Sequence, residues 1–305
     1  MALPMNSGSE AVETAIKVMR KWGYMIKKVP KDKAEIIVCR NNFHGRTTTV
    51  ISFSTDLQYR KDFDPLTPGF KVIDFGDAKQ LEEAITENTV AFLVEPIQGE
   101  GGIIVPPDGY LSQVRKICTE HNVLMACDEI QTGLGRTGTL FAYEHDSDAK
   151  PDVLILGKAL SGGFYPVSAV VASEEILGVF QPGDHGSTFG GNPLASAIAS
   201  AALDVTIEED LTKNSRELGA YLHTELRKIS SRHIKEIRGR GLFVGIEIKE
   251  SSGLARPFCE KLMTMGLLSK ETHEQIIRLA PPLIITKEEV DIIIKTVRKL
   301  FEEAE

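Results

Sequence analysis

Several residue types that mark specialised proteins are scarce in this sequence of 305 residues. It contains four cysteines and one tryptophan, and aromatic residues make up only 7% of it. No apolar run approaches the length needed to cross a bilayer, which argues against membrane insertion. The cysteines lie far apart and match no CxxC spacing, so we expect reduced core residues in a reducing compartment and no metal site; they are Cys39, Cys118, Cys127 and Cys259.

Positive charge is also in short supply. The 35 lysines and arginines are outnumbered by 43 aspartates and glutamates, which gives a formal net charge of −8. Because an acidic surface does not attract nucleic acid or anionic membranes at long range, a small-molecule substrate fits better than either partner. Residues 1–15 carry no recognisable targeting pattern, and we expect a cytoplasmic protein, or one of the mitochondrial matrix if the source is eukaryotic.

What the sequence does contain is a pair of reactive side chains at the ends of two apolar runs. Val123–Cys127 and Val153–Leu156 are short, aliphatic and bounded by polar turns, as expected for buried parallel strands. Asp128 follows the first run directly, and Lys158 follows the second after one glycine. Open α/β folds bind ligands where parallel strands end, so we expect the carboxylate and the amine to share one crevice.

An aspartate and a lysine held in this way suit pyridoxal phosphate. The lysine amine can form a Schiff base with this cofactor while the carboxylate pairs with its pyridinium nitrogen. On their own, two such residues are more often a structural ion pair. The segments DEIQTGLGRTG and LGKALSGG change this balance, because they resemble the signature of the class III, fold-type I pyridoxal-phosphate-dependent aminotransferases, in the subgroup that includes ornithine aminotransferase.

This resemblance covers essentially the whole chain and implies roles for particular residues. Lys158 and Asp128 would be the catalytic residues, and both would bind the cofactor. Gln131 would hydrogen-bond the ring oxygen of the cofactor.

The start of the sequence predicts a phosphate site. A short strand, Ala2–Met5, leads into Asn6–Glu10, after which apolar residues recur at helical spacing. Free N–H groups and the dipole at a helix start favour an anion, although an ordinary N-cap is the commoner meaning of a Ser-Gly pair. The resemblance implies that Gly8 and Ser9 bind the cofactor phosphate.

A predicted strand at Ile36–Cys39 delivers the segment NFHGRT to the same edge of the sheet. The ring of Phe43 can stack on a flat cofactor, and Arg46 can hold a carboxylate with two hydrogen bonds. Taken alone, these residues would be a core aromatic and a surface charge, and the resemblance instead assigns Phe43 to the cofactor and Arg46 to the substrate. We expect His44 to have a role in shape and none in proton transfer.

Two other enzyme classes are suggested by local patterns and fit poorly. Glu95 and Glu100 follow a predicted strand at Val90–Val94 and suggest the paired acids of a glycosidase. The Pro/Gly loop between them does not fix the distance between the two carboxylates, and no sugar-stacking aromatics accompany them. The segment 133–138 matches GxGxxG. It does not open a helix after the first strand of a βαβ unit, so a dinucleotide-binding dehydrogenase is disfavoured.

The resemblance further implies a substrate switch and a site shared between subunits. An enzyme that accepts ornithine by its δ-amine and 2-oxoglutarate by its α-carbon must mask one arginine in the first half-reaction, and Glu100 and Arg278 match the pair that does so. The loop 182–192 resembles the segment that reaches into the partner subunit, where Thr188 would contact the cofactor phosphate. We therefore expect a homodimer.

The pattern of apolar residues changes near residue 205. Residues 1–205 are expected to form a large cofactor-binding domain of α/β class around a mainly parallel sheet, and residues 206–305 a linking helix and a smaller α+β domain. Helices are expected at Pro193–Leu203 and Leu211–Ile229. The smaller domain is expected to contain strands at Leu242–Ile248 and Ile276–Leu279 and helices at Ala255–Met265 and Glu288–Phe301.

The function that the resemblance implies is transfer of the δ-amino group of L-ornithine to 2-oxoglutarate. The products would be glutamate and glutamate-5-semialdehyde, which cyclises to pyrroline-5-carboxylate in arginine and proline metabolism. Acetylornithine and 4-aminobutyrate aminotransferases share the core motifs and stay as alternatives, as does an incomplete fragment or a binding protein on the same scaffold. Family members carry further residues before the phosphate-binding turn, so we also expect part of the working enzyme to be missing from this chain.

Overall fold

The computed structural model describes residues 1–303 and divides the chain into two compact units. The large unit comprises Met1–Pro96, Pro106–Gln131 and Tyr143–Asp204. The small unit comprises Ile97–Val105, Thr132–Ala142 and the chain from Val205 onward. Two short excursions therefore leave the large unit and belong to the small one.

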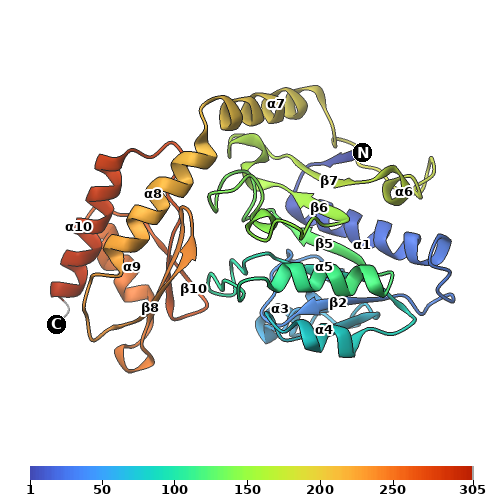
Figure 1. Cartoon of the computed structure of the whole chain (residues 1–305), viewed down its shortest axis with the longest axis horizontal. Coiled ribbons are helices and arrows are strands. Elements are labelled where there is room, and N and C mark those ends of the chain that lie inside the picture. The colour runs from blue at the N-terminus through green and yellow to red at the C-terminus, as the bar shows by residue number, and fades with distance from the viewer. Residues whose placement is uncertain (304–305) are drawn as a thin grey trace. The chain divides into compact units, whose positions relative to one another are not determined.

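A seven-stranded sheet forms the centre of the large unit (Figure 1). Its strands are β1 (Ala2–Met5), β2 (Glu35–Cys39), β3 (Phe70–Ile73), β4 (Thr89–Val94), β5 (Leu124–Asp128), β6 (Val153–Leu156) and β7 (Ser168–Ala172). They lie in the order β1-β7-β6-β5-β4-β2-β3. The run from β3 to β6 pairs in parallel, whereas β7 is antiparallel to both of its neighbours. The predicted mainly parallel central sheet is confirmed.

Helices cover both faces of this sheet. Ile36 and Val38 of β2 pack in one core with helix α1 (Gly8–Met25), whereas Ile37 and Cys39 pack in another with α4 (Ala78–Ala84) and α5 (Tyr110–Glu120). Since successive strand residues point to opposite faces, a strand covered on both sides is buried at every position and largely apolar. Strands β4 and β5 are buried throughout, and only Thr89 and Asp128 in them are polar. The short helices are α2 (Thr48–Ile51), α3 (Leu57–Arg60), α6 (Glu174–Leu177) and the 3₁₀ turns η1 (Ala142–His145) and η2 (Lys158–Ser161).

The small unit is built on a four-stranded antiparallel sheet in the order β10-β11-β9-β8. Its strands are β8 (Ile234–Arg240), β9 (Phe243–Ile248), β10 (Lys270–Thr272) and β11 (Ile276–Leu279). Its helices are α8 (Leu211–Leu226), the 3₁₀ turn η3 (Glu250–Ser252), α9 (Arg256–Thr264) and α10 (Lys287–Glu303). Apolar side chains of α8, α9 and α10 share one core with the sheet. Helix α7 (Pro193–Glu208) precedes α8 in the chain.

Most elements expected from the pattern are present at nearly the expected bounds. Strands β1, β6 and β11 match the expectation residue for residue, and β5 begins and ends one residue later than expected. Strands β3, β8 and β10 and helix α5 were not expected. Among residues 1–303, no helix is both long and apolar enough to span a membrane.

Candidate active site

Asp128 and Lys158 lie at the carboxyl ends of adjacent parallel strands. Asp128 is the last residue of β5 and pairs in register with Ile155 of β6. Strand β6 ends at Leu156, and Lys158 begins the 3₁₀ turn η2 three positions after Ile155. The carboxylate of Asp128 is buried, with 5% exposure, whereas Lys158 is exposed and adopts a left-handed φ of 41°. The sheet therefore presents a buried carboxylate and an accessible amine at one edge.

His44 is the hydrogen-bond partner of Asp128. Its Nδ1 lies 2.7 Å from Oδ2 of the carboxylate, and the other oxygen, Oδ1, accepts from the N–H of Ile130 at 3.1 Å. Burial alone would lower the pKa of His44, but the hydrogen bond to Asp128 and the negative charges of Asp128 and Glu95 outweigh it and raise this pKa. His44 was expected only to provide shape, and the structure adds a direct bond to the carboxylate.

The second nitrogen of His44 has a different environment. Nε2 is buried and has no hydrogen-bond partner among the residues that the structure describes. A buried polar atom without a partner is costly and is commonly found near functional sites. Among residues 1–303, the imidazole thus makes one side-chain hydrogen bond, and this bond orients the carboxylate of Asp128.

The turn for which phosphate binding was predicted is the capped start of α1. Ser7 is the N-cap, and its side chain and that of Glu10 form a reciprocal capping box. Gly8 and Ser9 occupy the first two helical positions, where a backbone N–H has no acceptor within the helix. The segment that carries His44 packs directly against this turn, because a Cβ added at Gly45 would lie 2.7 Å from the hydroxyl oxygen of Ser9.

Ile130 joins three parts of this region and was not among the expected site residues. A Cβ at Gly8 would lie 3.0 Å from Cδ1 of Ile130, and a Cβ at Gly157 would lie 3.4 Å from its side chain. The helix turn, the segment after Asp128 and the residue before Lys158 therefore all pack on one side chain. The signal for this contact was the pair of glycines, whose missing side chains leave room for it.

Phe43 and Arg46 are arranged around an aromatic residue that was not expected there. The ring centroids of Phe43 and Tyr59 are 6.0 Å apart in an edge-on arrangement, and Cζ of Arg46 lies 4.3 Å from the Tyr59 centroid. The backbone N–H of Phe43 donates to Oε1 of buried Glu95 at 2.9 Å. Arg46 is exposed and forms no ion pair with the acidic side chains of residues 1–303, so its guanidinium can receive a carboxylate.

The loop 182–192 is tied to the start of α1 in the same chain. Asn6 donates from Nδ2 to Oγ of Ser187 at 2.9 Å, and the His185 ring lies 2.8 Å from Oγ1 of Thr14. Burial, and after it the charge of Lys17, lowers the pKa of His185. Thr188, directly after Ser187, is exposed, and its side chain is accessible to another molecule.

The small unit brings together the two residues expected to switch. Nη1 of Arg278, on β11, donates to Oε1 of Glu100 at 2.6 Å. The side chains are only partly exposed, 16% for the arginine and 24% for the glutamate. Gln131, expected at the cofactor ring, is the residue directly before the excursion that begins at Thr132.

The GxGxxG segment 133–138 is a turn in the small unit and opens no helix. Arg136 within it donates from Nη1 to the carbonyl oxygens of Leu242 and Pro281 at 3.0 and 2.6 Å. Burial lowers the pKa of this arginine to about 10. The segment therefore anchors the chain within the small unit and lacks the helix start that binds a dinucleotide. This agrees with the expectation that the protein is not a dinucleotide-binding dehydrogenase.

The donor set of the large unit fits pyridoxal phosphate. An amine, a buried carboxylate and a helix start with outward N–H groups match the aldehyde, the ring nitrogen and the phosphate of this cofactor. A Cβ would crowd Ile130 at Gly8 and clash with the Ser9 hydroxyl at Gly45, and the carboxylate is held in place by His44. Sheet, helix start and donor set together define a pyridoxal-phosphate-dependent enzyme of fold type I.

The chain belongs to the class-III aminotransferase family, whose model matches residues 1–301. The ornithine aminotransferase 2 of Staphylococcus saprophyticus is 60% identical over 301 residues, which are 99% of this chain and 75% of that protein. The ornithine aminotransferase structure from Toxoplasma gondii matches with a TM-score of 0.97 at 46% identity, over 99% of this chain and 72% of that one. The acetylornithine aminotransferase structure from Elizabethkingia anophelis matches with a TM-score of 0.89 at 50% identity, over 99% and 75%.

These comparisons confirm the resemblance to this family. The chain is an aminotransferase that uses pyridoxal phosphate, a cofactor found at the active site in a further structure of the Toxoplasma protein.

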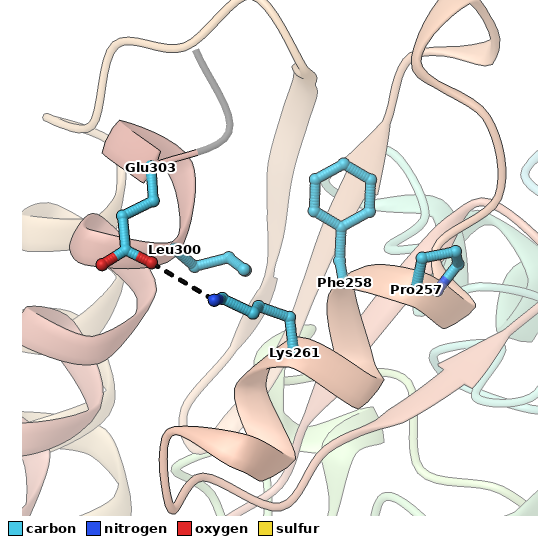
Figure 2. A pocket seen from close by; sticks show the side chains of 5 residues that line it. All are labelled: Pro257, Phe258, Lys261, Leu300 and Glu303. Carbon is cyan, nitrogen blue, oxygen red and sulfur yellow. Dashed lines mark ion pairs between the residues drawn. The ribbon is translucent and has the colours of Figure 1, made fainter.

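A separate cavity of about 300 Å³ lies in the small unit between α9 and α10 (Figure 2). It is lined by Pro257, Phe258, Lys261, Leu300 and Glu303. Lys261 and Glu303 form an ion pair with each other at 3.5 Å, and no expected site residue is among the lining residues. We assign the cavity no part in the reaction.

Proposed function

We propose that this aminotransferase moves the δ-amino group of L-ornithine to 2-oxoglutarate, producing glutamate-5-semialdehyde and glutamate. The semialdehyde then cyclises to pyrroline-5-carboxylate. The proposal draws on the names of the relatives, which include several bacterial ornithine aminotransferases at 56–60% identity.

The observation that carries the proposal is the ion pair between Glu100 and Arg278. The donor presents a terminal amine far from its carboxylate, whereas the acceptor presents a carboxylate beside the carbon that reacts. An arginine that binds the acceptor would attract the α-carboxylate of the donor in the wrong orientation. A carboxylate 2.6 Å from that arginine neutralises it for the first half-reaction and can release it for the second.

Pyridoxal phosphate, when bound, supplies an aldehyde that exchanges amines and a ring that accepts electrons. We assign Lys158 as the residue that would bind the aldehyde carbon of the cofactor. Asp128 would keep a proton on the ring nitrogen. Nζ of Lys158, once free, is the base that takes a proton from the δ-carbon of ornithine, and it later returns one to the α-carbon that derives from 2-oxoglutarate.

The remaining assignments concern binding and orientation. Gly8 and Ser9 donate to the phosphate, Phe43 covers one face of the ring, and Gln131 donates to the ring oxygen. Arg46 binds the substrate carboxylate that lies away from the reacting carbon. The exposed guanidinium of Arg46, stacked on Tyr59, supports this last assignment.

We also propose that the working form is a homodimer in which Thr188 binds the phosphate in the partner's site. Large apolar side chains of the large unit support an interface, since Phe164 is 84% and Phe189 70% exposed. Helix α7 buries only Ala195, although most of its residues are apolar. An apolar helix that buries little in its own chain is the kind of surface that a partner subunit covers. All four cysteines are buried and unpaired, which supports the cytoplasm or another reducing compartment.

Acetylornithine aminotransferase is the second candidate, because a structure with that name is 50% identical to this chain. Its donor also reacts at the δ-amine, but the α-amine is blocked. The two candidates therefore differ in whether a free α-ammonium is accepted.

A donor screen tests the proposal. The protein is loaded with pyridoxal phosphate and mixed in single-turnover experiments with L-ornithine, N-acetylornithine, 4-aminobutyrate or glutamate, and absorbance of the bound cofactor is followed. We expect the highest kcat/KM for L-ornithine among the ω-amines. A higher value for N-acetylornithine or 4-aminobutyrate would overturn the assignment of the donor.

A further inference from the structure

The excursion Ile97–Val105, which carries Glu100, is an ordered hairpin within the small unit. Gln98 and Ile104 exchange backbone hydrogen bonds of 3.1 and 2.9 Å. Ile97 and Ile103 are buried against Phe243 of β9. Ile103 has a φ of +52°, a conformation that costs a β-branched residue free energy and persists only where its surroundings enforce it.

Two side chains of the small-unit sheet hold the main chain of this hairpin. Oγ1 of Thr272, at the end of β10, donates to the carbonyl oxygen of Glu100 at 2.6 Å. Arg238 of β8 donates from Nη2 to the carbonyl oxygen of Gly102 at 2.8 Å and from Nε to that of Ile103 at 3.1 Å. Thr272 is only 4% exposed, so its hydroxyl bond is shielded from water.

Arg238 is itself fixed by carboxylates. It forms ion pairs with Glu236 at 2.9 Å and with Glu247 of the neighbouring strand. A guanidinium held on one side by acidic residues and bonded on the other to two consecutive carbonyls acts as a rigid bridge. The hairpin is thus attached to β8 and β10 through three of its carbonyl groups, those of Glu100, Gly102 and Ile103.

The side chain of Glu100 makes a different contact from its main chain. Its carboxylate is partly exposed, and its ion pair with Arg278 forms at the open end of a flexible side chain. Breaking such a pair by side-chain rotation leaves the backbone bonds to Thr272 and Arg238 intact. Uncovering Arg278 therefore breaks a partly solvated ion pair and does not require the hairpin to unfold.

We propose that Thr272 and Arg238 are positioning residues for the Glu100 switch: they fix the main chain of the hairpin so that only the Glu100 carboxylate moves. This inference rests on the proposed function, in which Glu100 covers Arg278 for the δ-amine donor. A fixed Cα returns the carboxylate to the same place over Arg278 in every cycle. Without the anchors, the carboxylate spends part of its time displaced, and Arg278 becomes accessible to α-amino acids in the first half-reaction.

The first test measures donor preference, the ratio of kcat/KM for L-ornithine to that for L-glutamate. Thr272→Val keeps the shape of the side chain and removes the hydroxyl, whereas Thr272→Ser keeps the hydroxyl. We expect Thr272→Val to lower the ratio about two- to tenfold, the range of one net hydrogen bond, and Thr272→Ser to restore it. In a Glu100→Ala background, Thr272→Val should change the ratio by less than about twofold, because the two effects act through the same carboxylate.

Ser215→Ala is the matched control. Ser215 is a buried residue of α8 whose hydroxyl donates to the carbonyl of Arg136 at 3.0 Å, so its loss removes a comparable bond elsewhere in the small unit. We expect Ser215→Ala to lower thermal stability without changing the ratio. An unchanged ratio in Thr272→Val, or an equal change in the Glu100→Ala background, would overturn the positioning role.

Hydrogen exchange provides a readout that does not depend on the donor. The backbone N–H groups of Gly102, Ile103 and Ile104 are bonded within the hairpin. We expect these three amides to exchange at least several-fold faster in Thr272→Val and Arg238→Gln than in the parent, and normally in Ser215→Ala. If the parent rejects ornithine but these amides still exchange faster in the two variants, the proposed function fails and the anchoring stands. If the amides exchange in the variants at the rate of the parent, the anchoring fails whichever donor is used.

Discussion

Nδ1 of His44 lies 2.7 Å from Oδ2 of Asp128, and the two residues are 84 positions apart in the sequence. The raised pKa of His44 means that the imidazolium is favoured next to the carboxylate. Its contribution to stability is therefore complete below its unfolded pKa of about 6.5 and is lost as pH rises through the raised folded value. The pair links the NFHGRT segment to the end of β5.

Removing this hydrogen bond should weaken the hold on the cofactor ring. In His44→Leu, Asp128 loses a charge-assisted bond, so we expect affinity for pyridoxal phosphate or the rate of ornithine turnover to fall by roughly ten- to hundredfold. His44→Asn can still donate to Asp128 and should retain a larger part of both. The measurements are cofactor titration and the pH dependence of the bound-cofactor absorbance. Equal behaviour of His44→Leu and the parent would contradict a positioning role for the imidazole.

Lys158 should be the residue to which the cofactor becomes attached. Borohydride reduction of the loaded protein, followed by mass spectrometry of its peptides, should find the cofactor on Lys158, because this amine is presented beside the buried carboxylate at the sheet edge. Lys158→Ala should give no adduct. Lys150→Ala, a change at an exposed lysine of the same unit, should leave it intact. An adduct on another lysine of the parent would rule out this assignment.

Glu100→Ala should shift the donor preference toward α-amino acids. Losing the carboxylate leaves Arg278 uncovered, so we expect the ornithine-to-glutamate ratio of kcat/KM to fall by roughly ten- to hundredfold, the range of a charge-assisted hydrogen bond. Glu288→Ala removes an exposed carboxylate from α10 of the same unit and should leave the ratio unchanged. Single-turnover absorbance measurements give both rates, and a ratio in Glu100→Ala like that of the parent would refute the switch.

Gly45→Ala should selectively impair recognition of the phosphate. The added Cβ would lie 2.7 Å from the Ser9 hydroxyl at a φ of +120°, so the hydroxyl must move. We expect about tenfold weaker binding of pyridoxal phosphate, and a smaller change for pyridoxal, which has no phosphate. Gly109→Ala is the control, since Gly109 also has a positive φ but no atom within 4 Å of an added Cβ. It should suffer backbone strain alone, and equal losses for pyridoxal and its phosphate in Gly45→Ala would exclude the proposed contact.

His223 should make the protein less stable in acid. Burial, followed by the charge of Arg227, lowers its pKa to about 4 from an ordinary 6.5. The unfolded chain therefore binds more protons between these two values, and stability should fall by roughly 3 kcal/mol as pH drops from 6.5 to 4. In His223→Leu this part of the pH dependence should disappear from urea denaturation measured across the range. His121→Leu, at an exposed histidine, should retain it.

The sequence alone determined those features that depend on short stretches of chain. The apolar run of β6 is uninterrupted, and that of β11 is broken only by Arg278, so the bounds of both strands could be predicted to the residue. Asp128 directly follows such a run and Lys158 follows another after one glycine, so both could be placed at one edge of the sheet from the sequence alone. Helix α5 shows that a usable local signal was overlooked, because its buried Leu111, Val114 and Cys118 recur at helical spacing.

Strand β8 illustrates where local pattern is weak. Only Ile237 of its seven residues is buried, because it pairs with β9 on one side alone and lies at the edge of its sheet. An edge strand carries polar residues on positions that a central strand would bury, so its sequence does not stand out from a loop.

Only the tertiary structure decided which distant residues meet. The bond from His44 to Asp128, the packing of Gly8 and Gly157 on Ile130, and the anchoring of Glu100 by Thr272 each join separate segments. Residues 97–105 and 132–142 likewise belong to the small unit. The sequence does not indicate this, because its pattern of apolar residues changes only near residue 205. Hydrophobic periodicity records whether a side chain is buried and on which face, but not its neighbour, because that is selected by the shapes and polar groups that every segment presents when the chain packs.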